Sequence, residues 1–211
     1  MALSSALAAE PQVRHIPWDP DASIWSRLRD DDKVVVVDRS SAVDRVQPPF
    51  NDLSLWIDDR TCVSDVVAIG TLSSTFSFWT RPETWLNTRL DIVVSRLLFA
   101  SPSYTGVKRI EVDTDGGRLK VRDITVEADA WLVERLKPGA SVLVFAGRVD
   151  DALRSTEELM LISNGRLRVP WQVSQKHPAE TILQNQRLDR IETLVRRARS
   201  SVNCAPARRQ P

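Results

Sequence analysis

The chain has 211 residues, of which 42% are hydrophobic and 27% charged, as in an ordinary globular protein. Its 29 basic and 28 acidic residues leave a net charge of +1, which excludes overall electrostatic attraction to nucleic acid or an anionic membrane. No apolar run is long enough to span a bilayer. The length predicts one large domain, or one domain with added segments at its ends.

Residues 1–20 are expected to form an irregular leader. The opening "MALSSALAAEPQ" carries a small-residue A-x-A pattern at Ala6-Leu7-Ala8, but it has no basic region and only a short apolar stretch. Two interpretations stay open. The segment is either the remnant of an export signal or a leader without structure.

Residues 21–61 predict a helical flank with one short strand. "DASIWSRLRDDD" has helical spacing behind a cap at Asp21, and "NDLSLWIDDR" has it behind Asn51 or Asp52. Between them, "KVVVV" at 33–37 is typical of a buried strand.

From residue 62 to residue 175 the pattern is that of β-structure. Gly70 interrupts an apolar strand, which indicates a bulge or a sharp bend, and residues 84–99 alternate with one apolar face. Asp115-Gly116 and Asn164-Gly165 predict hairpin turns, and "KPGASVLVFAG" predicts a strand that is buried on both faces.

The C-terminal part returns to helical spacing. Residues 176–200 predict an amphipathic helix with Pro178 in its first turn. The basic remainder, 201–211, is expected to be a flexible tail unless Cys204 holds it.

Four phrases occur in the order in which they occur in netrin-like modules, the OB-fold domains of tissue inhibitors of metalloproteinases and of complement proteins. "CVSDVVAIGTL" at 62–72 resembles the first barrel strand, "LDIVVSRLL" at 90–98 the long second strand, "KPGASVLVFAG" at 137–147 a later strand, and "RVPWQVSQ" at 168–175 the closing strand. With the terminal helix, they also resemble small secreted bacterial proteins of no assigned function. The resemblance covers about residues 62–200 and implies a mainly β fold, an OB-like (netrin-like) small β-barrel with short N-terminal helices and a C-terminal amphipathic helix.

The resemblance does not carry over the inhibitory activity of that family. The metalloproteinase inhibitors use an N-terminal cysteine on the catalytic zinc, whereas this chain starts with "MALSS" and has no Cys-x-Cys. Its two cysteines, Cys62 and Cys204, leave two alternatives: one disulfide that pins the C-terminal tail, or a half-buried Cys62 with a free Cys204.

No catalytic or metal-binding arrangement is found in the sequence. His15 and His177 have no neighbours at ligand spacing, and the acidic runs are typical of solvated turns and helix ends. We therefore expect no enzyme activity, no metal and no cofactor.

Seven tryptophans are many for this length. Trp79, Trp85 and Trp171 flank turns and strand ends, and Arg89 follows Trp85 closely. The interpretation we favour is that these rings fill the barrel ends. The alternative is a barrel face on which Trp79, Trp85, Arg89 and Trp171 bind a ligand by stacking.

The function expected from these patterns is a non-enzymatic binding or interaction module, exported in bacteria, that acts on a protein partner or an envelope ligand. The alternative is an OB-fold protein that binds single-stranded nucleic acid. An extracytoplasmic location is expected over a cytoplasmic one, and no membrane span is expected.

Overall fold

The computed structural model describes residues 12–38, 52–128, 135–149, 152–154, 159–169 and 182–200. Its elements follow one another in the order β1 (Val13–Pro17), the 3₁₀ helix η1 (Ile24–Arg27), β2 (Val34–Asp38), α1 (Leu53–Val63), β3 (Val66–Trp79), β4 (Leu86–Ala100), the 3₁₀ helix η2 (Pro102–Tyr104), β5 (Arg109–Asp115), β6 (Gly117–Val121), β7 (Ile124–Ala128), β8 (Ser141–Val149), β9 (Ala152–Arg154), β10 (Leu159–Ser163), β11 (Arg166–Arg168) and α4 (Leu188–Ser200). The expectation of a mainly β fold is confirmed.

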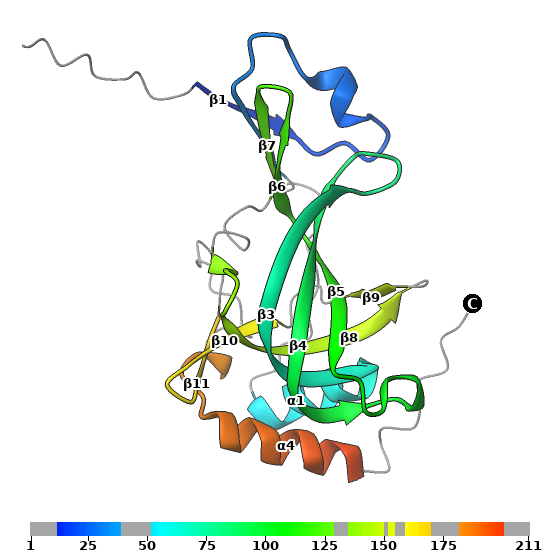
Figure 1. Ribbon diagram of the computed structural model, residues 1–211, viewed down its shortest axis with the longest axis vertical. Coiled ribbons are helices and arrows are strands. Elements are labelled where there is room, and N and C mark those ends of the chain that lie inside the picture. Colours follow the sequence, from blue (N-terminus) through cyan, green and yellow to red (C-terminus); the bar gives the residue numbers. More distant parts are fainter. Residues whose placement is uncertain are drawn as a thin grey trace, which may run out of the picture.

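The described strands form two sheets. A four-stranded sheet has the order β1-β2-β7-β6, and a seven-stranded sheet has the order β11-β10-β8-β3-β4-β5-β9. In Figure 1 the small sheet lies at one end of the molecule, α1 and α4 lie at the other, and the long strands β3 and β4 run between them.

The seven-stranded sheet does not form a closed barrel. Its edge strand β9 pairs with β8 through three residue pairs, but with β5 only through Asp113 and Arg154, in parallel. The connection from β5 through β9 back to β8 therefore depends on the single residue pair between β5 and β9.

Strand β8 buries both of its faces, as the sequence predicts for residues 137–147, and so do residues 66–70 of β3. On β3, Val66 and Ala68 point to the interior of the curved sheet, whereas Val67 and Ile69 point to the helices. On β8, Val144 faces the interior and its neighbours Leu143 and Phe145 face the helices. Alternate side chains therefore serve two separate cores, which makes these strands the centre of the fold.

The two helices cover the outer side of β3, β8 and β10. Asp52, one of the two caps that the sequence predicts, caps α1 by accepting hydrogen bonds from the backbone N–H groups of Ser54 and Leu55. Helix α4 packs on α1 and β4, where Arg96 donates to the buried Glu192 at 2.5 Å.

A third core lies at the far end of the β3–β4 hairpin, and we call it the tip core. It combines the hairpin with residues from the small sheet and η1: Ile16, Ile24, Val35, Val37, Trp85, Leu86, Val126 and Ala128. The β6–β7 hairpin lies within residues 62–175, over which a barrel is expected, but it pairs with β2 in the small sheet.

Other expectations in the N-terminal part also need correction. The supposedly irregular leader contains β1, which pairs in parallel with β2. The helix expected after Asp21 is only the four-residue η1, capped by Ser23, because Leu28 is already extended and Asp32 accepts a hydrogen bond from the backbone N–H of Arg29.

The helix expected over 176–200 is interrupted: Ile182 and Leu183 are helical, residues 184–187 are not, and α4 covers Leu188–Ser200. Pro178 lies outside the described residues. Asn185 adopts a left-handed backbone with φ of 65°. Around it, Leu167 of β11 exchanges backbone hydrogen bonds with Gln186 and Asn185, and this pairing interrupts the helical pattern.

Candidate binding face

The two described tryptophans of the predicted site belong to the tip core. Trp79 and Trp85 lie at the end of the β3–β4 hairpin, where the N–H of Thr80 donates to the carbonyl of Trp85 at 2.9 Å. Trp85 is 4% exposed and meets the edge of Trp18, and Trp79 contacts Trp25 with ring centroids 5.4 Å apart. The buried position of Trp85 supports the packing interpretation. Trp171 lies outside the described residues.

Arg89, the fourth predicted residue, lies on a different surface, the solvent side of β3, β4 and β5. Its guanidinium donates to both carboxylate oxygens of Asp113, at 2.8 and 3.1 Å. It also lies 5.2 Å from the centre of the Phe78 ring and 3.6 Å from Glu111. The structure therefore separates Arg89 from Trp85, although only three residues lie between them in the sequence.

Phe76 and Phe78 form the aromatic part of this surface. They are two residues apart on β3, and their rings stack with centroids 6.0 Å apart and planes inclined by 11°. Phe76 is 63% exposed, although it is a large apolar side chain. Because Arg89 is fixed by Asp113 and Phe78, the ring of Phe76 extends from a structured base.

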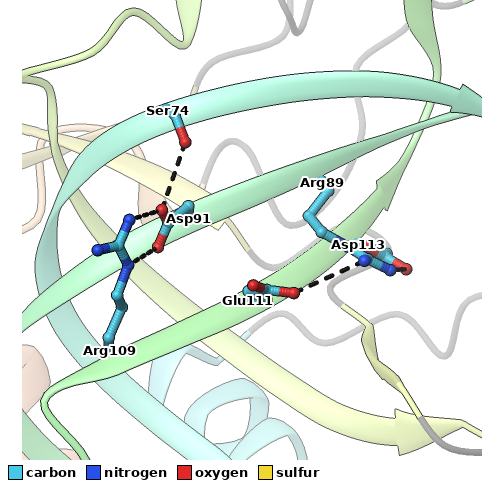
Figure 2. A network of polar contacts seen from close by, with 6 residues as sticks. All are labelled: Ser74, Arg89, Asp91, Arg109, Glu111 and Asp113. Atoms are coloured by element: carbon cyan, nitrogen blue, oxygen red, sulfur yellow. Dashed lines mark hydrogen bonds and ion pairs between the residues drawn. The ribbon is translucent and has the colours of Figure 1, made fainter.

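Figure 2 shows the charged part of the surface along β4 and β5. Arg109 pairs with Asp91, which also accepts a hydrogen bond from Ser74 at 3.3 Å. The bond from Arg109 is the main cause that holds the pKa of Asp91 below its ordinary value, and the same bond raises the pKa of Arg109. The pKa of Arg89 is raised, first of all by its bond to Asp113.

Two like charges face each other directly in this network. Asp91 on β4 is in register with Glu111 on β5, a cross-strand arrangement that is unfavourable for two carboxylates. Arg109 compensates Asp91, whereas Glu111 has an ion pair only at 3.6 Å and its side chain is 66% exposed. Glu111 is therefore the least compensated of the charges that Figure 2 draws.

We call this surface the strand face, and define it as Phe76, Phe78, Arg89, Asp91, Arg109, Glu111 and Asp113. Its two arginines and three carboxylates give it a negative net charge. Sequence reasoning identified Arg89 but missed the phenylalanines, because the predicted strand ended at Leu72 instead of continuing to Trp79. The alternation in "STFSFW" was the available signal.

The described part of the chain holds no cluster of His, Cys, Asp and Glu that could bind a metal ion. His15 contacts Asp38 at 2.8 Å at the small sheet, and His177 lies outside the described residues. Among the described helices, none combines the length and apolar character needed to cross a bilayer.

Cys62, near the end of α1, is disulfide-bonded. Cys204 is the only other cysteine of the sequence and lies outside the described residues, so the pairing of the two stays a prediction.

Comparison of the sequence with protein-family models gave no match, and comparison with curated proteins gave none either.

Proposed function

We propose that the chain is a non-enzymatic protein-binding module with an OB-like, netrin-like organisation, and that the strand face is its binding surface. The order of strand pairing supports the fold: β3, β4, β5, β9 and β8 follow one another, with β5 and β9 parallel. OB-folds are five-stranded, partly open barrels that bind ligands on the face of their second and third strands. In this chain those strands would be β4 and β5.

One observation carries the proposed binding role: Phe76 is 63% exposed and stacks on Phe78 beside a fixed arginine. An exposed aromatic ring on an ordered base contributes contact area at a small entropic cost. Aromatic side chains, phenylalanine included, and arginine are also enriched in protein interfaces relative to the rest of the surface.

A comparative capture experiment tests the proposal. Immobilised wild-type protein, Phe76→Ser and Leu55→Ser are exposed to the same cell extract, and captured proteins are quantified by mass spectrometry. Leu55 is an exposed apolar residue of α1 and serves as the matched control. A partner of the strand face is retained by Leu55→Ser and reduced at least tenfold by Phe76→Ser. Equal capture by all three proteins would reject the strand face as the binding surface.

Single-stranded nucleic acid is the second candidate ligand. The observation in its favour is the same stack, because a base can stack on an exposed ring next to arginine. The three carboxylates of the strand face oppose it, since they repel phosphate. Fluorescence anisotropy of a labelled 20-nucleotide poly-dT at low salt distinguishes the two: binding that Phe76→Ser abolishes favours nucleic acid, and no binding at low salt rejects it.

We also propose export to an oxidising compartment. The disulfide-bonded state of Cys62 supports this, because such bonds persist mainly outside the reducing cytosol. Fractionation of cells that express the gene from its native start tests it: recovery of the protein only in the cytoplasmic fraction would contradict export.

A further inference from the structure

The charge pattern of the strand face indicates the chemistry of its partner. Asp91 and Glu111 lie in register on neighbouring strands, and the ion pair of Glu111 is long, 3.6 Å from an arginine that Asp113 already holds by two hydrogen bonds. An incoming cation would relieve this repulsion, whereas an incoming anion would increase it. The strand face is thus electrostatically complementary to a positive charge.

Apolar contact is available on both sides of this charge. Phe76 pairs in register with Arg89, and Val93, which is 46% exposed, pairs in register with Arg109. Along β4 the positions of Arg89, Asp91 and Val93 follow at intervals of two, so their side chains share one face. The surface therefore presents an exposed ring, a carboxylate-rich centre and an exposed valine along one direction.

We propose that the partner of the strand face is a basic protein segment, in which a lysine or arginine contacts Glu111 and apolar side chains contact Phe76 and Val93. This inference rests on the proposed protein-binding function. It adds that the partner is positively charged and that Glu111 is the residue that contacts this charge.

A phage-displayed library of random 12-residue peptides tests the inference with defined probes. The library is sorted in parallel on wild-type protein and on Phe76→Ser. The enriched peptides are synthesised, and their affinities are measured for wild-type, Glu111→Gln and Asp123→Asn. Asp123 lies in the turn between β6 and β7, so its variant removes one negative charge away from the strand face.

The expected result is an excess of lysine and arginine among peptides whose enrichment requires Phe76. Their dissociation constants should rise about threefold on Glu111→Gln, the size of one exposed charge pair, and stay unchanged on Asp123→Asn. The Glu111→Gln effect should shrink in high salt, since exposed charges are screened.

Three other outcomes overturn the inference, and they differ in what they leave standing. Phe76-dependent peptides that are neutral or acidic, or that bind Glu111→Gln unchanged, reject a basic partner but keep the strand face as a binding surface. No Phe76-dependent enrichment rejects the proposed function as well. A dimer in sedimentation analysis that Phe76→Ser dissociates assigns the strand face to a second copy of the chain instead.

Discussion

Arg89 and Asp113 face each other in register across β4 and β5 and form a two-pronged ion pair, with unequal burial of the two partners. The side chain of Asp113 is 5% exposed, whereas that of Arg89 is 42% exposed. The pair thus holds the base of the strand face in place. Because the two side chains are buried to different extents, substitution of each should lower the folding stability by a different amount.

We expect Arg89→Met to destabilise the fold more than Asp113→Asn does. Removal of Arg89 leaves a buried carboxylate without its cation and should cost about 2–3 kcal/mol, whereas removal of the Asp113 charge leaves an arginine that still reaches solvent and Glu111, at about 1 kcal/mol. Urea unfolding measures both values. Arg187→Gln, at the exposed pair with Asp189, is the control and should change stability by less than about 0.5 kcal/mol. Equal losses for the two strand-face variants would contradict the expected asymmetry.

Acid should weaken the contact between Asp32 and Arg14. The two bonds from Arg14 are the main cause that lowers the pKa of Asp32 from 3.8 to about 2. A carboxylate with a lowered pKa stabilises the native state fully above the unfolded pKa, and this stabilisation is lost as the pH falls toward the native pKa.

The free-energy difference between wild-type and Asp32→Asn should therefore be about 2 kcal/mol above pH 4 and should shrink as the pH falls from 4 to 2. Urea unfolding across this range measures it. If the difference in unfolding free energy between wild-type and Asp32→Asn stays constant down to pH 2, the ion pair with Arg14 does not contribute to the stability of the native state.

Gly70 should not tolerate a side chain. A Cβ at this position would lie 2.5 Å from the carbonyl oxygen of Val93 and 2.5 Å from a methyl group of Ile92. The backbone oxygen belongs to the sheet and cannot turn away, so Gly70→Ala should cost about 2–3 kcal/mol. Thermal unfolding beside Thr71→Ala, an exposed neighbour with an expected change within about 0.5 kcal/mol, measures the effect. A Gly70→Ala protein as stable as this control would show that β3 and β4 can separate here.

The disulfide of Cys62 is expected to join Cys204. A proteolytic digest without reducing agent should contain one cross-linked peptide that carries both cysteines, and reduction should separate it. Cys204→Ser should lower the free energy of unfolding by about 2–5 kcal/mol, because the bridge closes a long loop in the unfolded chain. Alkylation of the denatured, unreduced protein at both thiols would contradict the pairing.

Local patterns in the sequence predicted the local structure well. The Asn164-Gly165 hairpin turn, the Asp52 cap and the two-sided strand β8 all depend on residues close in the chain. The hairpin predicted at Asp115-Gly116 was wrong, because β5 pairs with β4 and β9, whereas β6 pairs with β7 in the other sheet. The bulge expected at Gly70 is present as a shift of register between Ile69 and Gly70.

The sequence did not predict the second sheet or most of the strand face. The valines of β2 indicate a strand but not its partner, and β7 pairs with it from a distant part of the chain. No strand was predicted for the residues between Leu72 and Trp79, because a solvated strand face has little hydrophobic signal. The hydrophobic pattern of the sequence indicates which residues of a strand are buried. It does not indicate which distant strand will pair with it, because that depends on the whole fold.

The parallel pairing of β2 with β7 has a consequence for synthesis on the ribosome. Val34 pairs with Thr125, so about 90 further residues must be translated before the valines of β2 find their second partner strand, which takes roughly 5–20 seconds at ordinary elongation rates. During that interval the "VVVV" run of the nascent chain has β1 as a partner on one edge but lacks β7 on the other, and an uncharged β-former with an open edge is the kind of segment that aggregates or recruits chaperones. The early part of the polypeptide is thus among the last to reach its native place.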